Sequence, residues 1–255
     1  MREHMTTSPK MCIEPTAEQA IVLAGDMTKT IICEAVGQRG VCHVALSGGT
    51  TPQPMYQYLA RSATTGQEVP WADVEVFFGD ERCVSLDNVE SNYHMAQRLL
   101  LDHLPIEPDR VHPLRGDAEN VEAAAEEYEQ LIRHMVPAEP DGIPRFDLVL
   151  LGMGGDGHTA SLFAATTAEG EQKKLVAANF VPVLGRMRLT FTFPLINAAR
   201  NVMFLICGAD KAEAVAALTG GDAEARNRLP AAKVAPKDGQ LIYVMDAAAA
   251  RQVKA

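Results

Sequence analysis

A histidine at the end of a glycine-rich run is the residue of this chain best placed to do chemistry. Residues 152–158 read Gly-Met-Gly-Gly-Asp-Gly-His and follow a short apolar segment. A neutral imidazole takes up a proton near neutral pH, so His158 is a candidate general base toward water, and Asp156 could orient its ring. We expect His158 to begin a helix, whose positive end would disfavour the protonated ring. The alternative is a satisfied surface histidine, as most of the seven must be. His43, on an apolar strand, and five others on helices or loops have no such setting: His4, His94, His103, His112 and His134.

A second glycine-rich segment, Ser47-Gly48-Gly49-Thr50-Thr51-Pro52, has the composition of a phosphate-binding turn. Glycines let the backbone approach a ligand closely, and a helix start at Pro52, capped by Thr51, would offer free N–H groups to a phosphate monoester. The alternative is a tight turn with a helix cap. The segment is not a Walker loop, because no Gly-Lys-[Ser/Thr] follows. The glycines before His158 likewise differ in spacing from the dinucleotide fingerprint Gly-x-Gly-x-x-Gly.

The third segment, Gly79-Asp80-Glu81-Arg82, carries three charges in a row. It could be a metal site, a charge-paired structural turn or a pair that positions a ligand. A metal is the weakest interpretation, because no histidine or cysteine cluster accompanies the two acids. Asp80 and Arg82 are two residues apart, so on an extended stretch they point to the same side and could hold a polyhydroxylated ligand together.

Composition excludes several classes of partner. The 255 residues are 47% hydrophobic and 22% charged, which is typical of a globular protein. A formal net charge of −10 argues against nucleic acid and against an anionic membrane, so an anionic ligand must meet a local basic cluster. The five cysteines lack metal or Cys-x-x-Cys spacing and are interpreted as reduced thiols. Without an apolar leader or a membrane-length run, the sequence predicts a cytoplasmic enzyme.

Helices and strands alternate along the chain. Apolar spacing and punctuation predict helices over residues 17–36, from 52, and over 92–101, 118–135 and 209–218. Strands are expected at residues 41–46, 74–78, 146–151, 174–181, 187–193, 201–207 and 241–245. This order predicts an α/β fold, a single domain over residues 1–255 whose mostly parallel central sheet has helices on both faces. The first ten residues could be disordered, and the alanines of residues 247–250 are good helix formers.

Parallel strands end at one edge of a sheet, so the three segments that follow predicted strands should converge on one crevice. Taken in order, these motifs resemble the 6-phosphogluconolactonase family. The resemblance rests on residues 46–52, 77–82, 91–93 and 147–163, with weaker matches at 188–190 and 208–212. It implies a Rossmann-like fold similar to the glucosamine-6-phosphate deaminase/ribose-5-phosphate isomerase type. Two departures concern local packing, Ala164 in place of a proline and Tyr243 in place of a tryptophan.

The resemblance implies hydrolysis of 6-phosphoglucono-1,5-lactone to 6-phosphogluconate, with no cofactor and no metal. His158 would be the general base and then the general acid, oriented by Asp156. Arg82 and nearby backbone N–H groups would stabilise the oxyanion, and Asp80 would position sugar hydroxyls or water. The substrate would further contact Ser47, Gly48, Gly49, Thr50, Thr51, Asn92, Gly154, Gly155, Arg188 and Lys211. The partner is then a small phosphosugar lactone, and the oligomeric state is left open between monomer and homodimer.

Two alternatives stay open. A glucosamine-6-phosphate deaminase shares similar elements, but typically has Met-Asp-Glu-Tyr in place of Gly-Asp-Glu-Arg, and a glutamate in the segment after the histidine that this chain lacks. A non-catalytic sugar-phosphate sensor would keep the phosphate loop and lose turnover. Asp80, Arg82 and His158 are all present, which counts against the sensor.

Overall fold

The computed structural model describes residues 8–62, 69–220 and 222–253 of the chain. Its strands are β1 (Lys10–Glu14), β2 (Cys42–Leu46), β3 (Val74–Phe78), β4 (Asp80–Arg82), β5 (Leu148–Leu151), β6 (Val176–Val181), β7 (Arg186–Phe191), β8 (Asn201–Ile206) and β9 (Gln240–Asp246). Its α-helices are α1 (Ala17–Arg39), α2 (Gln53–Ser62), α3 (Asn92–Leu99), α4 (Val121–Met135), α5 (Phe193–Ile196), α6 (Ala212–Thr219) and α7 (Ala223–Asn227). Short 3₁₀ turns lie at Trp71–Asp73, Leu101–His103, Pro108–Arg110, Ala168–Gly170, Ala209–Lys211 and Pro230–Lys233.

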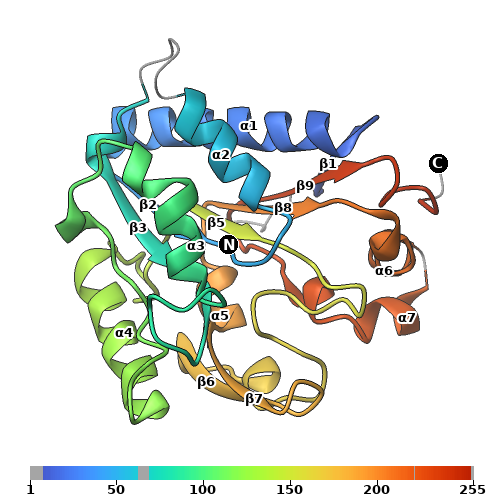
Figure 1. Cartoon of the computed structure of the whole chain (residues 1–255). Helices are drawn as coiled ribbons and strands as arrows, with labels where there is room; N and C mark the ends of the chain where they lie inside the picture. The colour runs from blue at the N-terminus through green and yellow to red at the C-terminus, as the bar shows by residue number, and fades with distance from the viewer. Residues whose placement is uncertain (1–7, 63–68, 221, 254–255) are drawn as a thin grey trace.

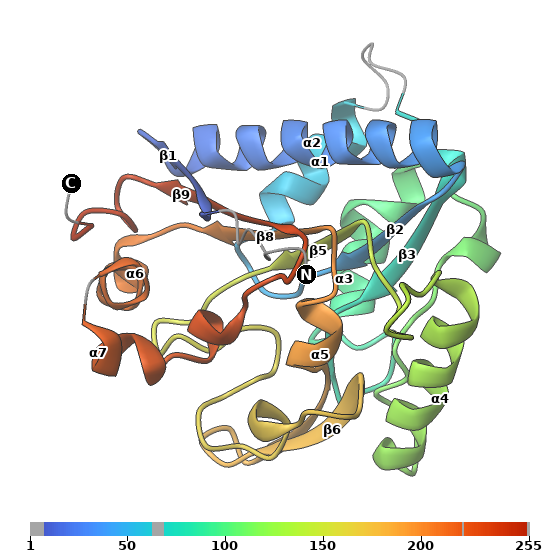
Figure 2. The same cartoon turned by 180° about the vertical axis from the view of Figure 1, so that it is seen from behind.

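Six strands form the central sheet in the order β1-β9-β8-β5-β2-β3, and every neighbouring pair is parallel. Strands β2, β3 and β5 are buried along their whole length, as expected where helices cover both faces of a sheet. The predicted α/β class with a mostly parallel sheet is therefore confirmed. Figure 1 shows α1 and α2 on one side of this sheet, and Figure 2 shows α4, α5 and β6 on the other.

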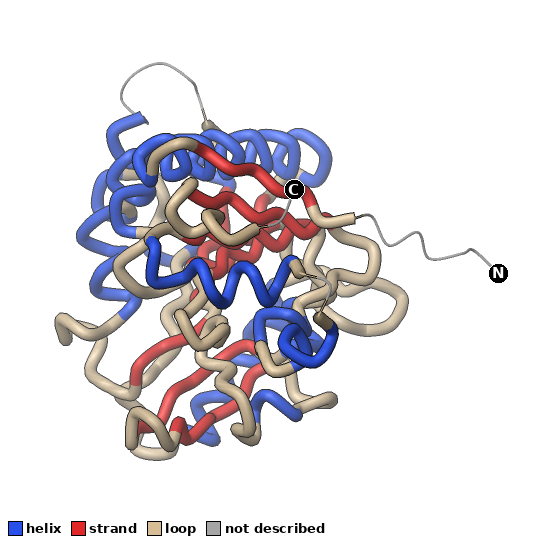
Figure 3. The backbone as a smooth tube through the Cα atoms, turned by 90° about the vertical axis from the view of Figure 1, so that its right-hand side faces the viewer, coloured by secondary structure: helices blue, strands red, loops and turns tan. Residues whose placement is uncertain are grey.

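A second sheet of three strands, in the order β4-β7-β6, is antiparallel. Strands β6 and β7 were expected from the sequence, but their place outside the central sheet was not, because strand propensity says nothing about pairing partners. Figure 3 shows the two groups of strands one above the other. The pairing of β4 with β7 carries Asp80 and Arg82 away from the central sheet, directly after β3 ends.

Several boundaries differ from the expectations. Helix α1 runs past Gly37 to Arg39, and Gly40 ends it in the left-handed conformation at φ 76°. Lys10 belongs to β1 and pairs with Ile242, so the expected disorder is wrong for Lys10; residues 1–7 lie outside the described residues. Residues 247–250 form turns, with the carboxylate of Asp246 accepting from the N–H of Ala249.

The two departures from the family pattern fit without conflict. Tyr243 is buried in β9 and stacks on Phe204 of β8, with ring centroids 5.2 Å apart. Ala164 is exposed on the loop after β5. Within the described residues, no helix has the length and apolar composition that a membrane crossing requires.

The chain order of the strands reverses between β2 and β5, because β3 lies beyond β2 on one side and β8 beyond β5 on the other. Ligands of open α/β sheets bind outside the carboxyl ends of the strands at such a reversal. The segments after β2, β3 and β5 are the three that the sequence singles out. The sheet order therefore places the candidate site at this edge.

At the amino ends of the strands, opposite the candidate site, a buried carboxylate contacts three segments of the chain. Asp147 is 2% exposed and accepts from the N–H of His43 at 2.9 Å. The guanidinium of Arg39 lies 2.9 Å from the same carboxylate and that of Arg200 lies 3.4 Å from it. Burial works to raise the pKa of Asp147, but the hydrogen bonds from His43 and the charge of Arg39 outweigh it, and the pKa lies below its usual range.

We predict that Asp147→Asn lowers the free energy of unfolding by about 2 kcal/mol at pH 7, because a buried charge-assisted network is broken. A carboxylate whose pKa is lower in the folded state stabilises the fold above its unfolded pKa, and this contribution is lost as the pH falls. The difference between the variant and the wild type should therefore shrink below about pH 4. Urea unfolding at several pH values measures it, with exposed Asp109→Asn as the control. A difference that does not depend on pH would contradict the prediction.

Candidate functional site

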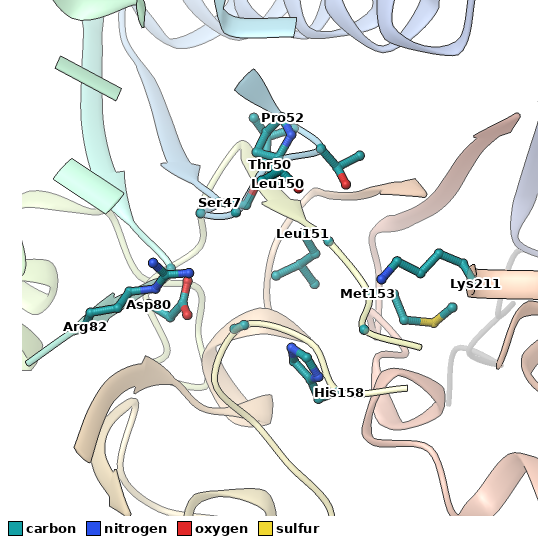
Figure 4. A pocket seen from close by; sticks show the side chains of 17 residues that line it. Ser47, Thr50, Pro52, Asp80, Arg82, Leu150, Leu151, Met153, His158 and Lys211 are labelled. Atoms are coloured by element: carbon teal, nitrogen blue, oxygen red, sulfur yellow. The ribbon is translucent and has the colours of Figure 1, made fainter. Parts of the chain in front are cut away.

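One cleft at the carboxyl edge of the central sheet brings the three segments together. The cleft has a volume of about 200 Å³. The cleft is lined by Ser47, Gly48, Gly49, Thr50, Thr51, Pro52, Gly79, Asp80, Arg82, Leu150, Leu151, Gly152, Met153, Gly154, His158, Ala160 and Lys211. Figure 4 shows Asp80 and Arg82 on one side, Lys211 on the other, and His158 facing the Ser47–Thr50 segment across the opening. The predicted convergence is confirmed.

The segment after β2 is held from below by a buried tyrosine. The hydroxyl of Tyr56 in α2 donates to the carbonyl of Ser47 at 2.7 Å and accepts from the N–H of Ser47 at 3.1 Å. Gly48 packs against the side chain of Asn92 so closely that a Cβ there would overlap it. Gly49 adopts φ 91°, which favours glycine. These contacts fix the turn with Thr50 and Thr51 in the cleft.

Asp80 begins β4 and is held through both carboxylate oxygens. Oδ1 accepts from the amide of Asn92 at 3.2 Å, and Oδ2 accepts from the hydroxyl of Ser161 at 2.7 Å. Only 8% of the residue is exposed. Asn92 does not line the cleft, since it is 2% exposed and also donates to the carbonyl of Asp80. Its contacts with Gly48 and Asp80 make it a support for both walls.

Glu81, next in the chain, points away from the cleft and anchors α3. Its carboxylate is fully buried and accepts from the N–H groups of Asn92 and Tyr93 and from the hydroxyl of Ser91. Burial raises the pKa of Glu81, while the hydrogen bonds from Asn92 and Tyr93 work against that rise. Successive side chains of a strand point to opposite sides. Asp80 and Arg82 therefore face the cleft, while Glu81 between them has a structural role.

Two arginines lie side by side on the second sheet. Arg82 of β4 lines the cleft and pairs in register with Arg188 of β7, so their side chains lie on the same face. Arg82 also donates to the carbonyl of Glu90 at 2.6 Å. Burial, and after it the charge of Arg82, lower the pKa of Arg188. Arg188 does not line the cleft, but both charges favour an anion beside Arg82.

His158 is paired with Asp156 as the sequence suggested. Nδ1 of the ring lies 2.5 Å from Oδ1 of Asp156, which leaves Nε2 for the cleft. A carboxylate accepts from Nδ1–H, so Nε2 is the unprotonated nitrogen of the neutral ring. Burial works to raise the pKa of Asp156, but the charge of His158 and its hydrogen bonds outweigh it, and the pKa lies below its usual range. Asp156 itself does not line the cleft.

The expected helix start at His158 is wrong. The chain turns here, with Gly157 at φ 79° and Ala160 at φ 47°, and the carbonyl of Leu162 accepts from the N–H of Thr159. Left-handed residues interrupt an α-helix. The ring is instead fixed by Phe163, which stacks on it with centroids 4.0 Å apart at 17°.

Glycines close the segment under the imidazole. A Cβ on Gly154 would overlap both His158 and Asp156, whereas one on Gly152 would meet nothing within 4 Å. The N–H of Gly154 donates to the carbonyl of His158 at 2.9 Å, so it is committed within the loop. Gly155 does not line the cleft and packs on the backbone of Asp210. Because glycine has no side chain, Gly154 leaves the space that the side chains of His158 and Asp156 occupy.

Lys211 reaches the cleft from the turn that follows β8. It forms an ion pair with Asp210 at 2.9 Å, and its side chain is 20% exposed. With Arg82 it gives the opening two cations in a chain whose net charge is −10. No three metal-binding side chains come together among the described residues.

Four supporting residues were not identified from the sequence as parts of the site. Tyr56, Glu81 in its anchoring role, Ser161 and Phe163 hold the lining residues and lie behind them. Ser161 and Phe163 stand in the motif that follows His158, and this proximity was the one available signal. The contacts of these four residues form only in the folded chain, so the spacing of residues in the sequence does not reveal them.

Comparison with known proteins agrees with this geometry. Residues 15–243 match the family model described as glucosamine-6-phosphate isomerases/6-phosphogluconolactonase. The chain belongs to this family. A 6-phosphogluconolactonase from Synechocystis sp. is 40% identical over 225 residues, which cover 88% of this chain and 90% of that protein.

Solved structures of family members share the fold. The 6-phosphogluconolactonase from Trypanosoma brucei superposes with a TM-score of 0.85 at 29% identity, covering 97% of this chain and 99% of that one. A monomeric glucosamine-6-phosphate deaminase superposes with a TM-score of 0.81 at 22% identity, covering 95% and 99%. At that identity the likeness shows the fold alone. The fold is therefore common to both activities that the sequence left open.

The close packing at Gly154 yields a structural prediction. Gly154→Ala should break the hydrogen bond between His158 and Asp156, because the added methyl group would occupy their space. Gly152→Ala, on the same cleft wall, should leave the bond intact. Nitrogen-15 NMR of the imidazole in both variants measures the bond. An unchanged Nδ1 signal in Gly154→Ala would show that the packing argument is wrong.

Proposed function

We propose that this chain hydrolyses 6-phosphoglucono-1,5-lactone to 6-phosphogluconate in the oxidative branch of the pentose phosphate pathway. The observation that carries the proposal is the Asp156–His158 pair at the cleft, with Asp80 and Arg82 across from it. The relatives named for this activity match the chain over most of its length. A base, a cation and a glycine-rich turn in one opening suit a phosphorylated ester.

In the proposed reaction, Nε2 of His158 takes a proton from a water molecule as its oxygen attacks the lactone carbonyl. The carbonyl π bond becomes an oxyanion, which the guanidinium of Arg82 stabilises. The oxyanion then collapses, the bond between the carbonyl carbon and the ring oxygen breaks, and the imidazolium returns its proton to that oxygen. One water is consumed, the lactone becomes an acid, and the enzyme is regenerated.

The remaining lining residues would bind and orient the substrate. Asp80, an acceptor fixed in one orientation, would hold sugar hydroxyls or the attacking water. The Ser47–Thr51 turn and Lys211 would hold the phosphate, since they offer hydroxyl, backbone and ammonium donors. Arg188 would add charge without lining the cleft, and Asn92 would act through Asp80 and Gly48. We also propose a cytoplasmic location, where free thiols such as the five cysteines persist.

Replacing the base tests the proposal directly. On fresh 6-phosphoglucono-1,5-lactone, with spontaneous hydrolysis subtracted, His158→Ala should lower kcat at least about 100-fold, because general base catalysis is lost. His134→Ala, at an exposed site on α4, should keep the wild-type rate.

An undiminished rate in His158→Ala would refute the assigned mechanism. Ammonia release from glucosamine 6-phosphate by the wild type would favour the deaminase. Phosphosugar binding with no rate above the spontaneous one would favour the sensor.

The lowered pKa of Asp156 yields a pH prediction. A carboxylate with a lowered pKa stays ionised as the pH falls through the usual range of a carboxyl group, so Asp156 accepts from Nδ1–H of His158 from about pH 5 upward. In Asp156→Asn this charged acceptor is absent. The plateau of the kcat/KM profile should therefore fall at least about 10-fold, because the tautomer of the ring is no longer fixed.

The profile of kcat/KM between about pH 5 and pH 9 measures this effect. Asp26→Asn is the matched control, because Asp26 also has a lowered pKa but lies on α1. A profile in Asp156→Asn that overlays the wild type would contradict the role of Asp156.

A further inference from the structure

The hydroxyl of Ser161 lies behind the cleft and touches one of its functional groups. Ser161 is 2% exposed and does not line the opening. Its Oγ donates to Oδ2 of Asp80 at 2.7 Å, a short hydrogen bond between two buried groups. The two residues are 81 positions apart, so the bond joins the segment after β5 to the segment after β3. Asp80 therefore receives this hydrogen bond only when the chain is folded.

Ser161 is itself held from two sides. Its N–H donates to the hydroxyl of Thr190, which lies opposite Asp80 in the β4–β7 register. Its carbonyl accepts from the amide of Asn179 at 2.9 Å, and Asn179 is 1% exposed. A hydroxyl on a backbone fixed at both polar groups has little freedom to move.

The backbone before Ser161 is strained. Ala160 is one of two non-glycine residues with positive φ in the described chain, at 47°. An alanine in this region is strained, and such strain persists where the surroundings demand the conformation. Here the left-handed residue turns the chain between His158, which faces the cleft, and Ser161, which faces Asp80. The strain thus serves the placement of both.

We propose that Ser161 is a positioning residue of the reaction, which fixes the carboxylate of Asp80 relative to His158. With Oδ1 held by Asn92 and Oδ2 by Ser161, rotation of the carboxylate is restrained, and its remaining lone pairs are left for a ligand in the cleft that Asp80 lines. The same loop carries His158 three residues earlier, so one short segment sets the geometry of base and acceptor together. This inference rests on the proposed function.

The test is a double-mutant cycle between Ser161→Ala and Asp80→Asn. Ser161→Ala should lower kcat about 10- to 100-fold and change KM less than about threefold, because the phosphate contacts are untouched. Added to Asp80→Asn, it should cost little more, since it acts through that carboxylate. Should Ser161→Ala fail to fold, Ser161→Cys, with its weak S–H donor, takes its place and should give a smaller loss in kcat of the same kind.

Thr28→Val is the matched control. The hydroxyl of Thr28 is equally buried, at 2% exposed, and donates to the carbonyl of Ala24 within α1, so it touches neither Asp80 nor Ser161. The control should keep kcat within about twofold of the wild type. Losses that add fully in the cycle, or a change confined to KM, would overturn the positioning role.

Crystal structures of the wild type and Ser161→Ala separate this inference from the proposed function. If the wild type shows no rate above spontaneous hydrolysis, the proposed function fails, but the structures still decide on Ser161. A rotated or disordered Asp80 carboxylate in the variant would support the positioning role. An unchanged orientation would overturn it, whatever the activity.

Discussion

The two hydrogen bonds to the carboxylate of Asp80 join the segments that make the site. Ser161 brings the loop after β5, and Asn92 brings the start of α3 together with Gly48 behind it. A buried carboxylate without such donors would cost several kcal/mol, so the loops are held where those donors can reach. The hydrogen bonds of the Asp80 carboxylate therefore determine where the segments that line the cleft lie.

This arrangement divides the residues of the site into two layers. The inner layer faces the cleft and includes His158, Asp80, Arg82 and Lys211. The outer layer fixes it: Asp156 and Phe163 hold the ring of His158, Tyr56 holds the turn after β2, and Glu81 anchors α3. Productive geometry depends on such supports, because a catalytic group displaced by 1 Å can lose about two orders of magnitude in rate.

Sheet topology explains how one fold serves two activities. A lactonase and a deaminase both superpose on this chain with TM-scores above 0.8. The strand order puts the segments after β2, β3 and β5 side by side whatever their side chains are. Function is then left to the side chains on those segments, which here place Asp80, Arg82 and His158 in the cleft.

The sequence alone determined the alternation of helices and strands, the parallel sheet and most lining residues, because hydrophobic period and glycine-rich turns are local signals. It could not determine that β4, β6 and β7 leave the central sheet, nor that His158 begins no helix. Strand pairing and the left-handed Ala160 depend on contacts between distant segments. For the same reason Ser161, 81 residues from its partner Asp80, acquired a role only in the tertiary structure.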